Sequence, residues 1–255
     1  MFEGLKRHRF LFEELVKRDF KKKYKGTMLG MGWSVLSPLL MLLVMKLIFE
    51  NFFGRTTPHY TTYLFCGLLV FQWFSESSNG GMRSLVGNSG IFTKVNIPKY
   101  LFLLSRNVQT LLNFALTLVV FFVFCAIDRV DFTWRFALLV YPVVTLLLFN
   151  IGVGMVLSAL HVFFRDMDYL WAVALQLLMY GSAIFYPVDR LSARAQAVFA
   201  VNPVYRHIAY VREIVLSGAV PSVATHLTLI GFAAAAILIG SFMYKRYNTR
   251  FLYYV

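Results

Sequence analysis

The stretch "YKGTMLGMGWSVLSP", residues 24–38, marks the point where a basic leader becomes an apolar run. Lysines crowd the residues before it, three glycines interrupt its middle, and a long hydrophobic segment begins at Pro38. A chain that lies along a membrane and then crosses it must bend at such a point, and glycine permits the bend. Gly26 and Gly30 also have the GxxxG spacing of closely packed helices. A plain flexible elbow is the alternative interpretation.

The composition indicates a polytopic membrane protein. Of the 255 residues, 59% are hydrophobic and 15% are charged, whereas soluble domains have about 25% charged residues. The mean hydropathy is +0.65. The net charge of +13 would suggest a nucleic-acid partner for a soluble chain, but in a membrane protein the location of the charges matters more. We therefore expect membrane lipid, and no nucleic acid, as a partner.

Six segments have the roughly 20 mostly apolar residues that a spanning helix needs. The second becomes polar in its far half, and the fourth contains Asn150, Gly152 and Gly154. Residues 188–222 are too apolar for a solvated loop and too interrupted for a span, which predicts short re-entrant helices on the outer side. The sequence thus predicts one all-α integral membrane domain over residues 1–255. The six predicted spans are 29–53, 61–82, 101–127, 134–160, 168–187 and 223–243.

The distribution of lysine and arginine predicts the orientation. Six spans place both termini on one side, and that side holds 17 of the 25 lysines and arginines, with seven on the other side and Lys46 inside a span. We therefore expect both termini in the cytoplasm. Residues 1–28 are predicted to form a basic amphipathic helix at the inner interface, attracted by anionic headgroups. A solvated charged leader is the alternative.

Motifs for catalysis or metal binding are absent from the sequence. It has no Gly-x4-Gly-Lys-Ser/Thr loop, no HExxH and no paired cysteines, and Cys66 and Cys125 lie inside apolar runs. We therefore expect no enzyme activity, metal or cofactor in this chain. Lys46 and Glu50 are four residues apart on the first span, which predicts a structural ion pair. A proton relay is the alternative, but no chain of titratable groups continues from them.

Four stretches together carry a resemblance to a known family. The chain resembles, from end to end, the membrane subunit of ABC-2 type polysaccharide exporters, which include O-antigen, capsule and teichoic acid permeases. The four stretches are "RDFKKKYKGTMLGMGWSVLSPLL" (18–40), "GNSGIFTKVNIPKYLFLLS" (87–105), "FFRDMDYL" (163–170) and "SAIFYPVDRL…VNPVYRHIAYVRE" (182–213).

The resemblance implies a half-transporter in the bacterial cytoplasmic membrane. Such permeases form homodimers with two copies of a separate cytosolic ATPase, which binds ATP and Mg, and they export a lipid-linked glycan. ATP-driven closure is passed on through short inner helices, here 88–100 and the Arg165–Asp168 turn. Ordinary positive-inside loops are the alternative reading of these segments. The implied coupling residues are Lys94, Pro98, Lys99, Arg165 and Asp166.

The aromatic residues are in excess, with 26 Phe, 14 Tyr and 4 Trp. Sugar rings have apolar C–H faces that stack on aromatic rings, so some of these residues are expected to line a glycan path. Trp73 and Tyr180 are expected near the middle of their spans. Core packing or an interfacial girdle is the alternative for the rings, and hydration near the inner interface is the alternative for Glu76. The path candidates are Trp33, Phe65, Phe71, Trp73, Phe74, Glu76, Trp171, Tyr180, Phe185 and Tyr186.

Two other functions compete with glycan export. The first is an ABC-2 exporter of a drug or lipid, which shares the family but not the substrate. The second is a secondary transporter or a membrane scaffold. A secondary transporter usually has internal repeats and a buried ion site, and the sequence contains no evident repeat.

Overall fold

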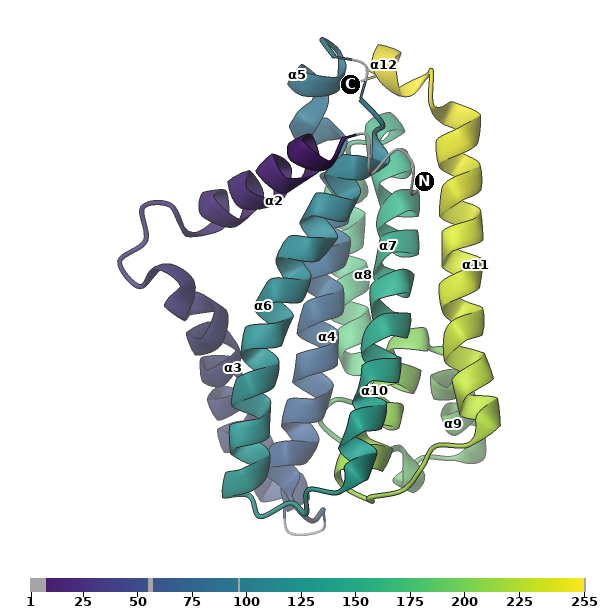
Figure 1. Ribbon diagram of the computed structural model, residues 1–255. Helices are drawn as coiled ribbons and strands as arrows, with labels where there is room; N and C mark the ends of the chain where they lie inside the picture. Colours follow the sequence, from purple (N-terminus) through teal and green to yellow (C-terminus); the bar gives the residue numbers. More distant parts are fainter. Residues whose placement is uncertain (1–7, 55–56, 96, 255) are drawn as a thin grey trace.

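The computed structural model describes residues 8–54, 57–95 and 97–254, and these residues form helices, turns and no strand (Figure 1). The long helices pack side by side along one axis. They are α3 (Trp33–Phe49), α4 (Tyr60–Met82), α6 (Tyr100–Ile127), α7 (Val140–Phe163), α8 (Met167–Gly181) and α11 (Val223–Tyr247). The others are α2 (Arg9–Tyr24), α5 (Ser89–Phe92), α9 (Ala193–Val201), α10 (Pro203–Val215) and α12 (Phe251–Tyr254).

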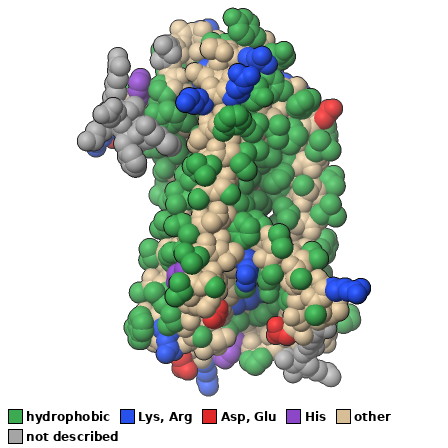
Figure 2. All heavy atoms as spheres, turned by 90° about the vertical axis from the view of Figure 1, so that its right-hand side faces the viewer, with side chains coloured by type: hydrophobic (Ala, Val, Ile, Leu, Met, Phe, Trp, Pro, Cys, Tyr) green, Lys and Arg blue, Asp and Glu red, His purple; other side chains and the backbone are tan. Residues whose placement is uncertain are grey.

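Four helical segments are long and apolar enough to cross a membrane. They coincide with the first, third, fourth and sixth predicted spans. Hydrophobic side chains cover the middle of the face shown in Figure 2, while Lys and Arg lie mostly toward its ends. This distribution suits a bundle whose middle contacts lipid. The full count of six spans stays a prediction, because α4 and α8 are not among the four. The four segments are Gly30–Phe53, Tyr100–Ile127, Trp134–Phe163 and Val223–Tyr247.

Helix α8 is shorter than the predicted span 168–187. Its 15 residues end at Gly181 and rise about 22 Å at 1.5 Å per residue, less than the roughly 30 Å of a hydrocarbon core. Beyond it, Ala183 has a left-handed backbone with φ of 49°. The carbonyl groups of Ala183 and Ile184 accept hydrogen bonds from Arg212 of α10. A tertiary contact therefore holds the turn at which the helix ends.

Helix α7 touches α11 and α4 through glycine residues. A Cβ atom at Gly152 would lie 2.5 Å from backbone atoms of both Ala236 and Ile237 in α11. A Cβ atom at Gly81 of α4 would lie 2.9 Å from the Cα atom of Gly154. Only residues without Cβ permit backbones to approach this closely. The glycines that break the apolar run of the fourth predicted span are therefore its packing points.

The end of the bundle that carries α2, α5 and α12 is called the basic end here (Figure 1). Helix α2 is attached to α6 through a buried carboxylate: Asp19 is 1% exposed and accepts hydrogen bonds from Ser105 at 3.0 Å and Arg18 at 2.7 Å. Residues 1–7 of the predicted interfacial segment 1–28 lie outside the described residues. A separate apolar cluster, the basic-end core, comprises Leu15, Leu85, Phe92, Ile97, Leu101, Phe102, Ala159, Val162 and Phe251.

The elbow between α2 and α3 depends on glycine for its backbone shape. Gly26 and Gly30 have φ angles of 79° and 52°, which favour glycine over other residues. A Cβ atom at either residue would meet nothing within 4 Å. Within this chain, the GxxxG spacing therefore serves the bend, and the helix-packing interpretation finds no contact to support it.

The opposite end of the bundle holds α9 and α10, which lie in the predicted outer segment 188–222. Helix α10 begins at Pro203, because the Asn202 side chain accepts hydrogen bonds from the backbone N–H groups of Val204 and Tyr205. The two short helices match the prediction in length. Their entry into the membrane stays a prediction.

Candidate functional site

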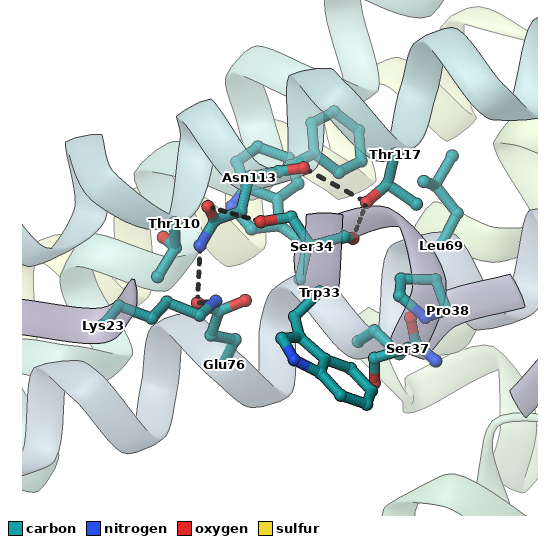
Figure 3. Close-up of a pocket in the computed structure, with 13 residues that line it drawn as sticks. Lys23, Trp33, Ser34, Ser37, Pro38, Leu69, Glu76, Thr110, Asn113 and Thr117 are labelled. Atoms are coloured by element: carbon teal, nitrogen blue, oxygen red, sulfur yellow. Dashed lines mark hydrogen bonds and ion pairs between the residues drawn. The ribbon is translucent and has the colours of Figure 1, made fainter. Parts of the chain in front are cut away.

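A cavity of about 450 Å³ lies beside the elbow, between the facing ends of α2 and α3 and the sides of α4 and α6 (Figure 3). Three of the predicted path residues, Trp33, Trp73 and Glu76, line this cavity together. Its walls combine aromatic and aliphatic surface with hydroxyl, amide and charged groups. The other lining residues are Lys23, Ser34, Ser37, Pro38, Leu69, Gln72, Thr110, Asn113, Phe114 and Thr117.

The carboxylate of Glu76 is compensated at the edge of the cavity. Lys23 Nζ at the end of α2 lies 2.6 Å from Glu76 Oε1, and Asn113 Nδ2 of α6 donates a hydrogen bond to the same oxygen at 2.9 Å. Both partners of the ion pair are about one third exposed. A lone carboxylate inside a membrane costs several kcal/mol, and this pair reduces that cost. The pair also fixes the end of α2 to α4.

A second polar network holds the start of α3 against α6. Tyr24 Oη donates a hydrogen bond to Asn113 Oδ1 at 2.7 Å, and Thr117 Oγ1 donates to the Ser34 carbonyl at 3.2 Å. The sequence analysis missed these residues, because single hydroxyl and amide groups on separate helices carry no local signal. Their position along one face of α6, at 113 and 117, is the only pattern that could have found them.

Trp73 forms the aromatic wall of the cavity. Its indole stacks on the ring of Phe114 with 4.1 Å between centroids and an interplanar angle of 22°. The residue is 3% exposed, and its Nε1 atom has no hydrogen-bond partner among the described residues. Trp33, on the other side of the elbow, is 42% exposed. The cavity therefore has an aromatic wall, and the N–H donor of Trp73 is buried without a partner among the described residues.

The other seven path candidates do not line this cavity. Phe65 makes an edge contact with Phe121, and Phe185 stacks on Phe49 at 4.7 Å, which are contacts between packed core rings. Tyr180 is the next-to-last residue of α8 and 52% exposed, so its predicted place near the middle of a span is wrong. A part in the path stays a prediction for all seven, which are Phe65, Phe71, Phe74, Trp171, Tyr180, Phe185 and Tyr186.

The predicted coupling residues lie at the basic end, and two of them bind the C-terminal tail. Lys99 Nζ donates hydrogen bonds to the backbone oxygen and to Oδ1 of Asn248, at 2.8 and 2.9 Å, and partial burial lowers the pKa of Lys99. Arg165 Nη2 donates to the carbonyl oxygen of Tyr254 at 3.3 Å. The sequence did not predict these contacts. Of the remaining three, Lys94 and Asp166 are exposed and Pro98 is partly exposed.

An ion pair that the sequence analysis missed connects two helix ends here. Arg83, directly after α4, lies 2.8 Å from Asp168 in the first turn of α8. Asp168 also lies 3.8 Å from Nε2 of His161 near the end of α7. The available signal was that opposite charges flank the ends of two predicted spans. The pair places the Arg165–Asp168 turn against the end of α4.

A family model described as "ABC-2 type transporter" matches residues 11–216 of this chain. The chain belongs to the ABC-2 type transporter family. In this family the permease is a transmembrane subunit and the ATPase is a separate protein. Membership confirms the resemblance seen in the four sequence stretches. It also removes the secondary transporter and the membrane scaffold from the alternatives.

Three relatives illustrate what the chain is similar to. It is 30% identical over 216 residues to an O-antigen export system permease protein RfbA of Klebsiella pneumoniae, covering 82% of each chain. It is 33% identical over 204 residues to RfbA of Myxococcus xanthus, covering 78% of this chain and 77% of the relative. It is 24% identical over 246 residues to the polysialic acid transport protein KpsM of Escherichia coli, covering 95% of each.

Proposed function

We propose that this chain is the membrane-spanning subunit of an ATP-powered exporter that moves a lipid-linked polysaccharide out of the bacterial cytoplasm. The cavity beside the elbow is the observation that carries the proposal, because Trp33, Trp73 and the paired carboxylate of Glu76 share one space of about 450 Å³. The relatives' names, which refer to O-antigen and polysialic acid, support a glycan as the cargo.

The lining of the cavity suits a sugar chain. Apolar C–H faces of a sugar ring can stack on the indole of Trp33, which is 42% exposed, while its hydroxyl groups can bond to Gln72, Thr110 and Glu76, which also line the cavity. An exporter of apolar drugs or lipids, the remaining alternative in the family, has little use for these hydrogen-bonding groups. The chemistry of the walls therefore favours a glycan over an apolar cargo.

The membrane topology that fits this function has six crossings, by α3, α4, α6, α7, α11, and α8 together with the residues that follow it up to 187. The basic end then faces the cytoplasm, as the positions of 17 of the 25 lysines and arginines predict. Helices α9 and α10 are then re-entrant elements at the outer side. In this orientation both chain ends and both coupling segments are on the cytoplasmic side, where ATP is available.

A second copy of the chain is proposed to cover α8 and α3. Within one chain α8 buries only Leu175, while Leu170, Val173 and Leu177 are 62, 59 and 70% exposed. Helix α8 alone is also shorter than the hydrocarbon core of a bilayer, so lipid cannot cover it along the full thickness of the membrane. A homodimer with two ATPase subunits would cover this face and leave the elbow cavities at the inner side.

Replacing Trp73 with leucine should reduce glycan export while leaving folded protein near the wild-type level. Leucine keeps apolar bulk but removes the aromatic ring that forms part of the cavity wall. The measurement is surface glycan in cells together with the amount of monodisperse protein in detergent. Phe121→Leu is the control, because Phe121 is fully buried, does not line the cavity and is not a path candidate. Normal export by Trp73→Leu at normal protein level would place the glycan path elsewhere.

The purified permease alone should hydrolyse no ATP, because the sequence lacks a phosphate-binding loop. Co-expressed with its partner ATPase, it should purify as a complex with equal numbers of the two subunits. Arg165→Glu should reduce export by the complex without unfolding the permease, since Arg165 is exposed. Lys25→Glu, an exposed cation outside both coupling segments, is the matched control. ATP hydrolysis by the clean permease would contradict the proposal.

A further inference from the structure

The last residues of the chain form a strap across the basic end. Residues 248–254, here called the C-terminal strap, include α12 and follow directly on α11. Figure 1 shows α12 at the same end as α5, well away from the opposite end with α9. The family match stops at residue 216, so the strap lies outside the segment that the family model describes.

A buried phenylalanine anchors the strap. Phe251 is 0% exposed and belongs to the basic-end core. Its ring lies 5.6 Å from that of Tyr244 in α11 and 5.8 Å from that of Phe163, the last residue of α7. Phe163 also contacts the ring of Tyr254 at 5.2 Å. A ring buried this completely holds the strap in one position, because leaving it would expose apolar surface.

The strap binds one cation from each coupling segment. Asn248, at its start, accepts two hydrogen bonds from Lys99, and Tyr254, at its end, accepts one from Arg165. Lys99 Nζ also lies 5.6 Å from the ring of Phe92 in α5. The strap therefore connects the coupling segment 88–100, between α4 and α6, to the Arg165–Asp168 turn between α7 and α8.

We propose that the C-terminal strap is a positioning element that holds the two coupling segments in a fixed relation, so that movement of one is passed to the other. This role rests on the proposed function, because it concerns how an ATPase partner drives the permease. The basic-end core also joins the two regions, through Phe92 on one side and Val162 on the other, and the strap adds a hydrogen-bonded link to a cation of each coupling segment. With the strap, a buried anchor and two bonded ends join them directly.

The first test measures the relation between the two segments in the full-length permease in lipid nanodiscs. Val95 and Phe164, which are 55% and 62% exposed, are each replaced by a cysteine that carries a spin label. The native Cys66 and Cys125 are shielded from the label because they are buried. The distance distribution between the labels should be narrow. Phe251→Ala should broaden it, whereas Phe251→Leu and Tyr253→Ala should not, because Tyr253 is 85% exposed. An unchanged distribution in Phe251→Ala would overturn the proposal.

The second test measures coupling in the complex with the ATPase partner. The ratio of surface glycan exported to ATP hydrolysed should fall in Phe251→Ala by roughly twofold to thirtyfold, the range found for mutations along coupling networks. Asn248→Ala should lower the ratio less, since the backbone acceptor remains, and Asn248→Asp should preserve it. If Phe251→Ala does not fold, the comparison of Asn248→Ala with Asn248→Asp tests whether the strap transmits movement. A normal ratio in all folded strap variants would overturn the proposal.

The two tests also separate this proposal from the proposed function. If no ATPase joins the permease, or no glycan is exported by the wild-type complex, the proposed function fails. The label distances in the permease alone still report whether the strap holds the two segments together. A broadened distance with an unchanged ratio in the working complex contradicts the transmitting role alone.

Discussion

Replacing Arg212 with leucine is expected to remove most of the folded protein and to lower the thermal midpoint of what remains. Arg212 lies on α10 and is 8% exposed. Its side chain donates to the carbonyl groups of Tyr63, Ala183 and Ile184 and to the Tyr63 hydroxyl, at 2.8–3.3 Å. The guanidinium also stacks 3.5 Å from the centroid of the Tyr63 ring. One side chain therefore fastens α10, α4 and the turn after α8.

The size of the effect follows from the acceptors that lose their donor. Among the described residues, no carboxylate lies within ion-pair distance of Arg212, so the carbonyl dipoles of Tyr63, Ala183 and Ile184 stabilise its charge. Each buried acceptor left unpaired costs about 1–3 kcal/mol, which predicts a midpoint lower by roughly 5–20 °C for two carbonyls. Gly67 makes room for the guanidinium, since a Cβ atom there would lie 3.0 Å from Nη2.

The measurement is the thermal unfolding midpoint in detergent, with folded yield by size-exclusion chromatography. Arg212→Lys should fall between wild type and leucine, because lysine keeps the charge but not the planar fork of five donors. Arg194→Leu, which removes an exposed arginine on α9, should leave the midpoint unchanged. If Arg212→Leu unfolded at the same temperature as the wild type, the hydrogen bonds of Arg212 would contribute nothing to stability.

Replacing Gly152 with alanine should destabilise the bundle by about 1–3 kcal/mol, the usual cost of overpacking. The new methyl group would lie 2.5 Å from the backbone C of Ala236 and N of Ile237, and 2.7 Å from the Ala236 Cβ atom. Backbone atoms cannot rotate away as a side chain can, so α11 as a whole must shift from α7. Unfolding of purified protein by heat or denaturant measures the loss.

Gly231→Ala on α11 is the matched control for this prediction. A Cβ atom at Gly231 would meet nothing within 4 Å. In a helix interior alanine is favoured over glycine by about 1 kcal/mol, so this variant should be neutral or slightly stabilised. The same chemical change should therefore have opposite signs at two helical positions. Equal effects at both positions would refute the close approach of α7 and α11.

The sequence predicted the parts of the fold that depend on local pattern. The spans that became α3, α6, α7 and α11 are long apolar runs, and length and hydropathy suffice to find them. The ion pair of Lys46 and Glu50 is likewise local, and the structure confirms it at 3.6 Å. The family followed from four short stretches whose residues are recognisable without knowing their contacts.

The candidate site could be predicted only in part. The chemistry of Trp33, Trp73 and Glu76 predicts them as path residues, and all three line one cavity. The sequence indicates only an inner-side charge for Lys23, although it pairs with Glu76 across 53 residues of sequence. It predicts no role in the site for Tyr24, Ser34 or Asn113. The shape of the elbow determines which side chains of α2 and α3 reach α4 and α6. That shape depends on contacts between segments that are distant in the sequence, so no single segment predicts it.

By itself, the sequence determined that the chain is a helical membrane protein of the ABC-2 type without a nucleotide-binding motif, because apolar length, charge and motifs are properties of short segments. Only the tertiary structure decided that Gly152 is a contact point, that Arg212 is a buried clamp and that Lys99 and Arg165 bind the C-terminal strap. Arg212 and Tyr63 are 149 residues apart in the chain. Such roles depend on which backbones come within a few ångströms of each other, and only the packed bundle fixes that.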